Sequence, residues 1–412
     1  MKKILALVMA MAMILALVAC GAAPAAENNN AANEGNGGTT TATIKVGAIY
    51  INSKNDTAGY TFAHHSGITA AMKALGLNPD DLLIVDNVPE EDQAVKAAID
   101  DLAGQGADII FGISFNYLNA INEKAAEYTD IIFSHATGYL ANETNFNNYF
   151  GRIYQARYLA GIAAGLKSLE TGNNKVGYVA AFTTDLAETA SGINGFALGV
   201  QAVNPNAEIY VKSLNSWADE VNEKAYAEDL IKSVGCGVVS QHCDSAQPQI
   251  AAQNAGVFGC GYNSDMTADA PKAHLTAAIW NWNVYYQTAM EAAIACNGDA
   301  SKFVEKMGSN AYYGGLKEGF VDVSPLTENC AAGTEEAIKQ VKELIVSGEW
   351  DVFSGVKLNI TVAEDGTVTV EKTDAALETN AGAVVVEAGA GSVDDGVIKG
   401  TMDYLVKGVE EV

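Results

Sequence analysis

The sequence F-S-H-A-T-G-Y occupies residues 133–139, and after a polar Asn-rich loop the chain reads Y-F-G-R-I-Y-Q-A-R-Y-L-A-G-I-A-A-G over residues 149–165. Before this stretch a short apolar run alternates with a helical pattern four times. After it the alternation starts again, so the stretch separates two α/β lobes. Ligands of open α/β sheets bind beyond the carboxyl ends of the strands. His135 and Thr137 follow the apolar run 131–133 and are therefore expected beside a ligand crevice.

Arg152 lies at the crossing between the two predicted lobes. Tyr154 and Arg157 follow it at short spacing, and the three side chains form either a ligand contact or a solvated hinge surface. Both interpretations remain open at this point, because the pattern favours neither.

Two aromatic side chains begin the first predicted helix of the first lobe. Residues 44–51 predict a strand and residues 60–75 predict the helix after it. Tyr60 and His64 are four residues apart and so share one helical face, where a flat ring can stack on a ligand and an imidazole can bond to it. A core tyrosine beside a capped or exposed histidine explains the same spacing.

Ser114 and Phe115 follow the third predicted strand of the first lobe, at residues 108–112. Their position after a strand end makes them candidate ligand contacts. A helix N-cap at Ser114 with Phe115 as local packing is the alternative.

Further candidate ligand contacts lie at the strand ends of the second lobe. Trp217 is predicted in a loop, where a purely structural tryptophan is less expected, so its ring is a candidate for stacking on a ligand. Asp219 is a candidate contact or the N-cap of the next helix. The other candidates, which close predicted strands or precede the returning helix, are Asp244, Asn263, Asp265 and Trp280.

The last third of the chain is predicted to return to the first lobe and then to form an extension. An amphipathic helix that ends near residue 295 carries the chain back. An E-D-G turn at residues 364–366 predicts a hairpin, and residues 396–409 predict a final helix. The expected organisation is a first lobe of residues 44–136 plus about 284–322, a second lobe of residues 137–283 plus about 323–350, and a C-terminal extension of residues 351–412 that packs on the lobes.

Length and composition limit the class of protein. A chain of 412 residues suffices for two substantial domains, and 49% apolar with 18% charged residues is typical of a globular protein. The formal charge of −26 leaves no excess of lysine and arginine to neutralise phosphates, which argues against nucleic acid as a partner.

The first 43 residues are predicted to contain a targeting segment followed by a tether. Lys2 and Lys3 precede an apolar run that ends in Leu-Val-Ala-Cys, so residues 1–19 are expected to be a lipoprotein signal peptide and Cys20 the lipidated residue. Residues 20–43 are small, polar and rich in Gly and Asn, as in a flexible tether. The protein is therefore expected at the extracytoplasmic face of the cell membrane, held there by the lipid on Cys20.

Five cysteines remain after Cys20, so at least one thiol stays free or pairs between molecules. No C-x-x-C or H-x-x-x-H spacing supports a metal site, and neither a metal nor another cofactor is expected. Buried, apolar thiols are the better interpretation. The five residues are Cys236, Cys243, Cys260, Cys296 and Cys330.

Several motifs in order resemble the basic membrane protein family of substrate-binding lipoproteins, relatives of purine nucleoside receptors that serve ABC transporters. They include F-S-H-A-T-G-Y with G-R-I-Y-Q-A-R-Y-L-A-G, S-W-A-D-E, Q-H-C-D-S-A, G-C-G-Y-N-S-D-M and I-W-N-W-N-V-Y-Y. The resemblance implies a type I periplasmic-binding-protein fold, in which two α/β lobes joined by hinge strands close on the ligand. It also implies that Tyr60 and Trp217 sandwich a purine.

Two positions depart from the nucleoside receptors that this chain resembles. Asn263 stands where they carry an aspartate, and Trp280 stands where they carry a lysine. Both changes fall on the sugar side of the implied site, so a purine nucleobase is the expected ligand and an ABC permease the expected membrane partner. A nucleoside-binding receptor, or a ligand-sensing lipoprotein not coupled to transport, is the alternative. An enzyme is not expected, because the chain contains no G-x-S-x-G, phosphate-binding loop or H-E-x-x-H.

Overall fold

The computed structural model of the chain describes residues 43–57 and 59–412. The expected signal peptide, Cys20 and all but the last residue of the tether lie outside the described residues. Within the described ranges, no helix is both long and apolar enough to cross a membrane.

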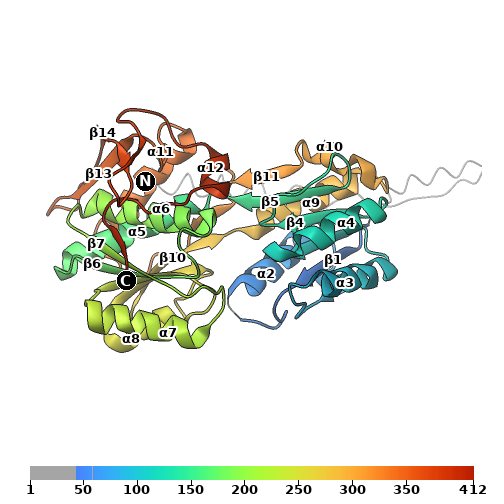
Figure 1. Ribbon diagram of the computed structural model, residues 1–412, viewed down its shortest axis with the longest axis horizontal. Helices are drawn as coiled ribbons and strands as arrows, with labels where there is room; N and C mark the ends of the chain where they lie inside the picture. Colours follow the sequence, from blue (N-terminus) through green and yellow to red (C-terminus); the bar gives the residue numbers. More distant parts are fainter. Residues whose placement is uncertain (1–42, 58) are drawn as a thin grey trace, which may run out of the picture. The chain divides into compact units, whose positions relative to one another are not determined.

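The first lobe is built on a sheet of six parallel strands in the order β11-β5-β4-β3-β1-β2. Helices α2 and α9 pack together, as do α3 and α4, and the two pairs cover the two faces of this sheet (Figure 1). The strands are β1 (Val46–Tyr50), β2 (Leu83–Val85), β3 (Ile109–Ile113), β4 (Ile132–Ala136), β5 (Phe146–Gly151) and β11 (Ala311–Gly314). The helices are α2 (Gly59–Ala74), α3 (Asp92–Gly104), α4 (Leu118–Glu127), α9 (Trp282–Ala295) and the short α10 (Phe303–Met307).

Strand β3 shows why the sequence of this lobe folds as it does. Its side chains alternate between the faces of the sheet: Ile109, Phe111 and Ile113 enter the core beneath α2 and α9, and Ile110 enters the core beneath α3 and α4. A strand that is buried on both faces has to be apolar throughout, which is why it appears in the sequence as a short continuous apolar run.

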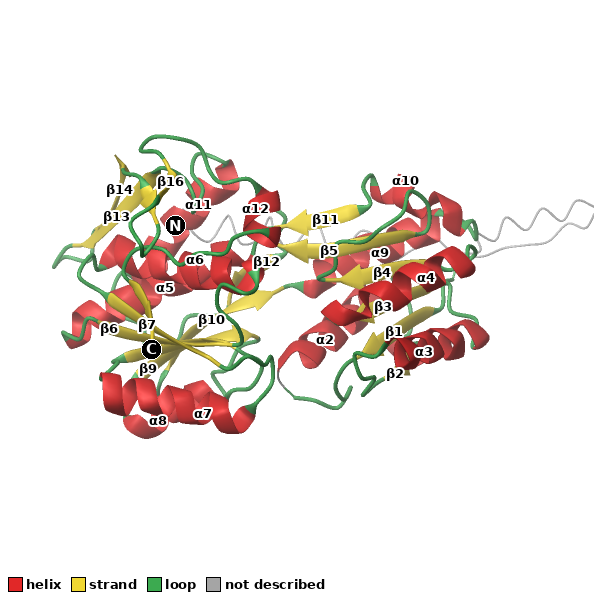
Figure 2. Ribbon diagram, in the orientation of Figure 1, coloured by secondary structure: helices red, strands yellow, loops and turns green. Residues whose placement is uncertain are grey.

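The second lobe is built on a sheet of seven strands in the order β12-β10-β9-β8-β6-β7-β17. Helices α5 and α6 lie on one face and α7 and α8 on the other (Figure 2). The strands are β6 (Lys175–Ala180), β7 (Glu208–Ser213), β8 (Val238–His242), β9 (Phe258–Asn263), β10 (His274–Trp280), β12 (Val321–Val323) and β17 (Val409–Glu411). The helices are α5 (Ile153–Thr171), α6 (Ala187–Val203), α7 (Glu220–Asp229) with a π-turn over Leu230–Val234, and α8 (Gln247–Ala255).

Helices α5 and α6 approach each other at glycines. A Cβ atom on Gly161 would overlap the carbonyl oxygen of Phe196, and one on Gly199 would overlap that of Tyr158. Residues without a side chain are required at both positions, because backbone meets backbone there. The Y-L-A-G motif of the stretch that decides the fold is therefore a helix-packing motif.

Three segments join the lobes, from β5 to α5, from β10 to α9 and from β11 to β12. They are hydrogen-bonded to one another: Arg152 N donates to Gly314 O (2.7 Å) and Asn281 N donates to Phe320 O (2.8 Å). The first crossing comes after β5, so the first sheet continues to Gly151, beyond the boundary at residue 136 that the sequence predicts. The Asn-rich segment was expected to be a loop, and it contains a strand.

The C-terminal extension packs on the second lobe, where it contacts α6, α11 and β7. The hairpin predicted around E-D-G is present as β13 and β14. The predicted final helix over 396–409 is wrong beyond residue 400, because the chain then leaves the helix and adds β17 to the edge of the second sheet. Helix α11 (Thr334–Ser347) precedes the extension and packs on α5. The elements of the extension, besides β17, are β13 (Val356–Val362), β14 (Val368–Asp374), β15 (Leu377–Glu378), β16 (Val384–Val386) and α12 (Asp395–Gly400).

Candidate ligand-binding site

The two lobes meet where α2 begins. Gly59 has a left-handed backbone (φ +83°), and a Cβ atom there would lie 2.8 Å from the carbonyl oxygen of Asp244, in the loop after β8. Tyr60 follows and comes close to the carboxyl groups of Asp244 and Glu188. The strand ends of the second lobe therefore face the first helix of the first lobe.

Asp244 and Asn263 form a polar pair at this junction. The Asn263 Nδ2 donates to Asp244 Oδ1 at 2.9 Å. Asn263 is only 2% exposed, and within residues 43–57 and 59–412 its Oδ1 has no hydrogen-bond partner. The hydroxyl of Tyr60 is likewise buried and unpaired among the described residues. Buried polar atoms of this kind are rare in folded proteins, and a bound ligand is one explanation of them.

Two residues at the same junction have strained backbones. Thr137, directly after β4, and Asn263, the last residue of β9, have φ of 65° and 68°. A left-handed conformation is unusual for a β-branched residue such as threonine and costs on the order of 1–3 kcal/mol. Strained residues of this kind cluster at functional sites.

Glu188 and Asp244 are acidic groups with unusual protonation behaviour. Burial raises the pKa of each carboxyl to about 7, although the nearby Arg157 guanidinium lowers the pKa of Glu188 and the Asn263 amide lowers that of Asp244. The Glu188 side chain remains 20% exposed, and its Oε1 lies 3.5 Å from His242 Nε2. Burial lowers the pKa of His242 well below its usual value, so the imidazole is neutral. The pair Glu188–His242 is therefore not an ion pair near neutral pH.

Arg157 is a deeply buried cation, 1% exposed, in the second lobe. Its Nη1 donates to the Tyr178 hydroxyl (2.6 Å) and to Gln241 O (3.0 Å), and its guanidinium lies 4.1 Å from the centre of the Tyr262 ring. In the part of the chain that the structure describes, Nε and Nη2 have no partner. A guanidinium in this position offsets part of the negative charge of the two carboxyls.

Aromatic rings form a wall beside these polar groups, at the crossing from β10 to α9. Trp282 stacks on His64 (centroids 3.8 Å apart) and on Trp280 (4.6 Å). Trp280 also donates from Nε1 to the Tyr262 hydroxyl at 3.2 Å. His64 is held by Tyr286, whose hydroxyl lies 2.6 Å from His64 Nδ1. His64 and Trp280 were predicted as ligand contacts, and the structure places both in this stacked wall.

Trp217 lies in the loop after β7 and is half-buried. Its carbonyl accepts a hydrogen bond from Asp244 N (3.1 Å), and its ring lies 5.3 Å from Phe182 and 5.9 Å from His242. The predicted stacking residue is therefore next to the Asp244–Asn263 pair.

The other predicted site residues in the first lobe have partners within that lobe. His135 Nε2 lies 2.7 Å from Ser114 O, and the Ser114 hydroxyl donates to Glu90. Phe115 is exposed and its ring is near that of Tyr139. Each of the three residues therefore has a neighbour within the first lobe, although the buried Nδ1 of His135 has no hydrogen-bond partner among the described residues.

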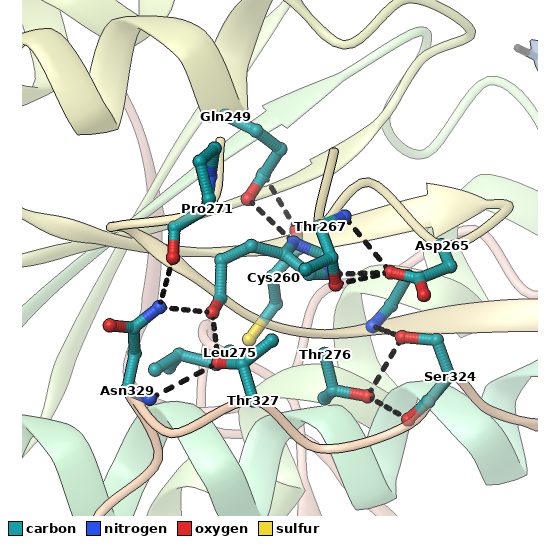
Figure 3. Close-up of polar contacts among 12 residues, drawn as sticks. Gln249, Cys260, Asp265, Thr267, Pro271, Leu275, Thr276, Ser324, Thr327 and Asn329 are labelled. Carbon is teal, nitrogen blue, oxygen red and sulfur yellow. Dashed lines mark hydrogen bonds and ion pairs between the residues drawn. The ribbon is translucent and has the colours of Figure 1, made fainter. Parts of the chain in front are cut away.

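Arg152, Asp219 and Asp265 also have structural partners. Arg152 forms an ion pair with Asp395 of α12, which makes it a hinge contact. Asp219 caps α7 by accepting from Asn222 N at 3.1 Å. Asp265 accepts from the backbone and hydroxyl of Thr267, in the polar network drawn in Figure 3.

Four residues of this cluster were not predicted from the sequence. Each lies at the carboxyl end of a strand, at the start of the helix that follows, or in the W-N-W motif. The four are Glu188, His242, Tyr262 and Trp282. For Arg157 the sequence left a ligand contact and a solvated hinge surface open, and its burial inside the second lobe excludes the solvated surface.

A cavity of about 460 Å³ lies elsewhere, against the C-terminal extension, with Trp350, Asp351 and Lys372 in its lining. We assign the candidate site to the junction of the lobes, because unpaired buried atoms of Tyr60, Arg157 and Asn263 and the left-handed residues Thr137 and Asn263 lie there. No three His, Cys, Asp or Glu side chains within the described ranges are placed to hold a metal ion. The five cysteines after Cys20 are free thiols, of which only Cys330 is not fully buried.

Two α/β lobes joined by three crossing segments, with polar and aromatic groups converging where they meet, define a two-lobe solute-binding protein. The chain belongs to the Bmp family, described as ABC transporter substrate-binding protein PnrA-like, whose profile matches residues 44–352. Members of this family are solute-binding proteins and not enzymes, and they work outside the cytoplasmic membrane. The predicted fold, the type I periplasmic-binding-protein fold, is confirmed.

Two relatives show how the family varies. The chain is 32% identical over 322 residues to TsgA13 of Haloferax volcanii, named as a glucose-binding ABC transporter protein, covering 78% of this chain and 77% of that one. It is 31% identical over 312 residues to a purine-binding protein of Brucella abortus, covering 76% and 83%. A solute-binding protein of an ABC transporter system from Conexibacter woesei has a similar fold, with a TM-score of 0.59, 20% identity and coverage of 75% and 98%.

Proposed function

We propose that this protein captures a purine nucleobase and presents it to an ABC permease. The observation that carries the proposal is the junction of the lobes, where stacked aromatic rings adjoin unpaired hydrogen-bonding atoms of Tyr60 and Asn263. A purine needs both features, because its flat faces stack and its edges carry donors and acceptors. The purine-binding relative from Brucella abortus supports the same ligand class.

The environment of Trp280 favours a free base over a nucleoside. Its indole is buried, stacks on Trp282 and lies 5.0 Å from the Phe150 ring. The ammonium that the resembling nucleoside receptors place at this position is absent, and the single indole donor already bonds to Tyr262. Ribose hydroxyls would lose a charged partner, and each buried hydroxyl left unpaired costs about 1–3 kcal/mol.

We expect free purine bases to bind at least about tenfold more tightly than their nucleosides, which corresponds to one such unpaired group. Calorimetry of the mature protein in detergent with adenine, hypoxanthine, guanine, the matching nucleosides and glucose measures this ratio. Trp280→Lys should reduce this difference in affinity between free bases and nucleosides. Tighter binding of nucleosides would favour the nucleoside-receptor alternative, and binding of glucose alone would favour the activity for which the Haloferax relative is named.

We also propose that a lipid on Cys20 holds the protein at the membrane, because the apolar run, the small residues and the cysteine occur in the order of a lipoprotein signal. Mass spectrometry of the protein from its native membrane should show a chain that begins at a lipid-modified Cys20. An intact Met1 would contradict this. Cys20→Ser should release the protein or leave the signal peptide uncleaved, whereas Cys330→Ser, the matched control, should remain anchored.

A further inference from the structure

We infer that Glu188 and Asp244 make this site selective for purines that present N–H donors and carry no negative charge. The inference rests on the proposed function, because it concerns which purines the same site accepts. It names Glu188, at the start of α6, as a specificity-determining residue for the ligand.

The charges around the junction are unbalanced. The carboxyl groups of Glu188 and Glu223 both lie near enough to Asp244 to raise its pKa, whereas the guanidinium of Arg157 lies near Glu188 and lowers the pKa of that carboxyl. His242 adds no charge, because its imidazole is neutral near neutral pH. Tyr60 and Tyr262 lie near the carboxyls of Glu188 and Asp244. Both tyrosines remain protonated, because burial and these carboxylates raise the pKa of their hydroxyls. An anionic ligand would therefore enter a site that already carries net negative charge.

The carboxyl groups differ in how far they are already satisfied. Glu223 accepts from Ser245 N (3.1 Å) and from Asp219 N (3.0 Å), so it serves the loop structure of the second lobe. Asp244 has one oxygen bonded to Asn263. The Glu188 carboxyl lies 3.5 Å from the neutral His242 and has Arg157 nearby. Each of these two carboxyls retains acceptor capacity, since a carboxylate accepts about four hydrogen bonds.

The unpaired atoms at the junction include both donors and acceptors, and the acceptors matter for the choice of ligand. Besides the two carboxyls, Asn263 offers its unpaired Oδ1, while its amide nitrogen is used by Asp244. The guanidinium of Arg157, which is a donor, lies against the face of Tyr262, with its Nε beside the backbone of α6 at Gly192. A ligand has to supply N–H groups to satisfy these acceptors. Adenine and guanine have N–H groups at more than one edge, whereas urate is an anion near neutral pH and AMP carries a phosphate.

The test is calorimetry of the mature protein in detergent at pH 8, where both carboxyls are ionised, with adenine, guanine, urate and AMP. We expect adenine or guanine to bind at least tenfold more tightly than urate or AMP. Glu188→Gln and Asp244→Asn should each reduce this preference by at least threefold. The matched control is Glu335→Gln, which removes an exposed carboxylate from the first turn of α11 and should leave the preference unchanged.

A second readout follows from protonation. Protonation removes acceptor capacity from Glu188 and Asp244, so the affinity of the wild-type protein for adenine or guanine should fall between pH 8 and pH 6, and the double variant should lose this dependence. Thermal unfolding of each variant verifies that it is folded. Urate or AMP bound as tightly as adenine would overturn the inference and leave purine binding in place, whereas a protein that binds none of these purines would overturn the proposed function and the inference together.

Discussion

A chain that ends at residue 352, where the family profile stops, is expected not to fold. The residues beyond it bury eleven apolar side chains, among them Phe353, Leu358, Ile360 and Val409. Each fully buried side chain of this kind stabilises the fold by about 1.5–3 kcal/mol, whereas a whole domain is stable by only about 5–15 kcal/mol. Removal of the extension also exposes the apolar surface of the second lobe that these side chains cover. Circular dichroism of the truncated chain during urea denaturation should show no cooperative unfolding transition.

Single substitutions at two neighbouring residues of α12 also test whether the extension stabilises the fold. Ile398 is 1% exposed and Val397 is 37% exposed. Ile398→Ala should lower the free energy of unfolding by about 2–5 kcal/mol, because it leaves a cavity between the extension and the second lobe. Val397→Ala should change it by less than about 0.5 kcal/mol. Equal effects of the two substitutions, or a truncated chain that unfolds cooperatively, would show that the extension does not stabilise the second lobe.

The two errors in the predicted fold have physical causes. Alternation of apolar runs with helical patterns identified most strands, because strands buried on both faces have to be apolar. Strand β5 contains Asn147 and Asn148, which looked like loop residues. Both are buried inside the lobe, where Asn147 Oδ1 accepts from the Tyr285 hydroxyl at 3.0 Å. Strand β17 depends on pairing with β7, a contact between distant parts of the sequence that no local pattern encodes.

Residues of the candidate site could be predicted only where a polar or aromatic side chain lies at or after the end of a predicted strand. Tyr60, Asp244 and Asn263 follow strands, and the structure brings them together. Glu188 was not predicted as a site residue, because an acidic residue in the first turn of a helix is usually explained by the helix dipole. The role of Arg157 stayed open in the sequence, because an arginine inside an amphipathic helix usually reaches solvent. Only the packing of α5 against the second sheet shows that this one is buried.

The replacement of Trp282 by alanine is expected to have the largest effect of any single substitution at the junction. Its ring is fully buried between His64 and Trp280, and its edge contacts include Tyr149 and Phe320. Truncation of a buried tryptophan costs about 3–5 kcal/mol, and the cavity would open at a crossing between the lobes. Urea denaturation of Trp282→Ala should therefore show a free energy of unfolding lower by that amount.

Trp217→Ala is the control that separates packing from ligand binding. Trp217 is only half-buried, and its ring contacts two aromatic neighbours at centroid distances of 5.3 and 5.9 Å, so its loss should cost less stability than the loss of the fully buried Trp282. If its ring stacks on the purine, the same substitution should weaken base binding by about 1–3 kcal/mol, roughly a 5- to 150-fold rise in Kd. The two tryptophans should therefore separate into one that mainly stabilises the junction and one that mainly binds the ligand. A large loss of stability in Trp217→Ala with unchanged affinity would assign both rings to packing and would remove stacking by Trp217 from the proposed mode of binding.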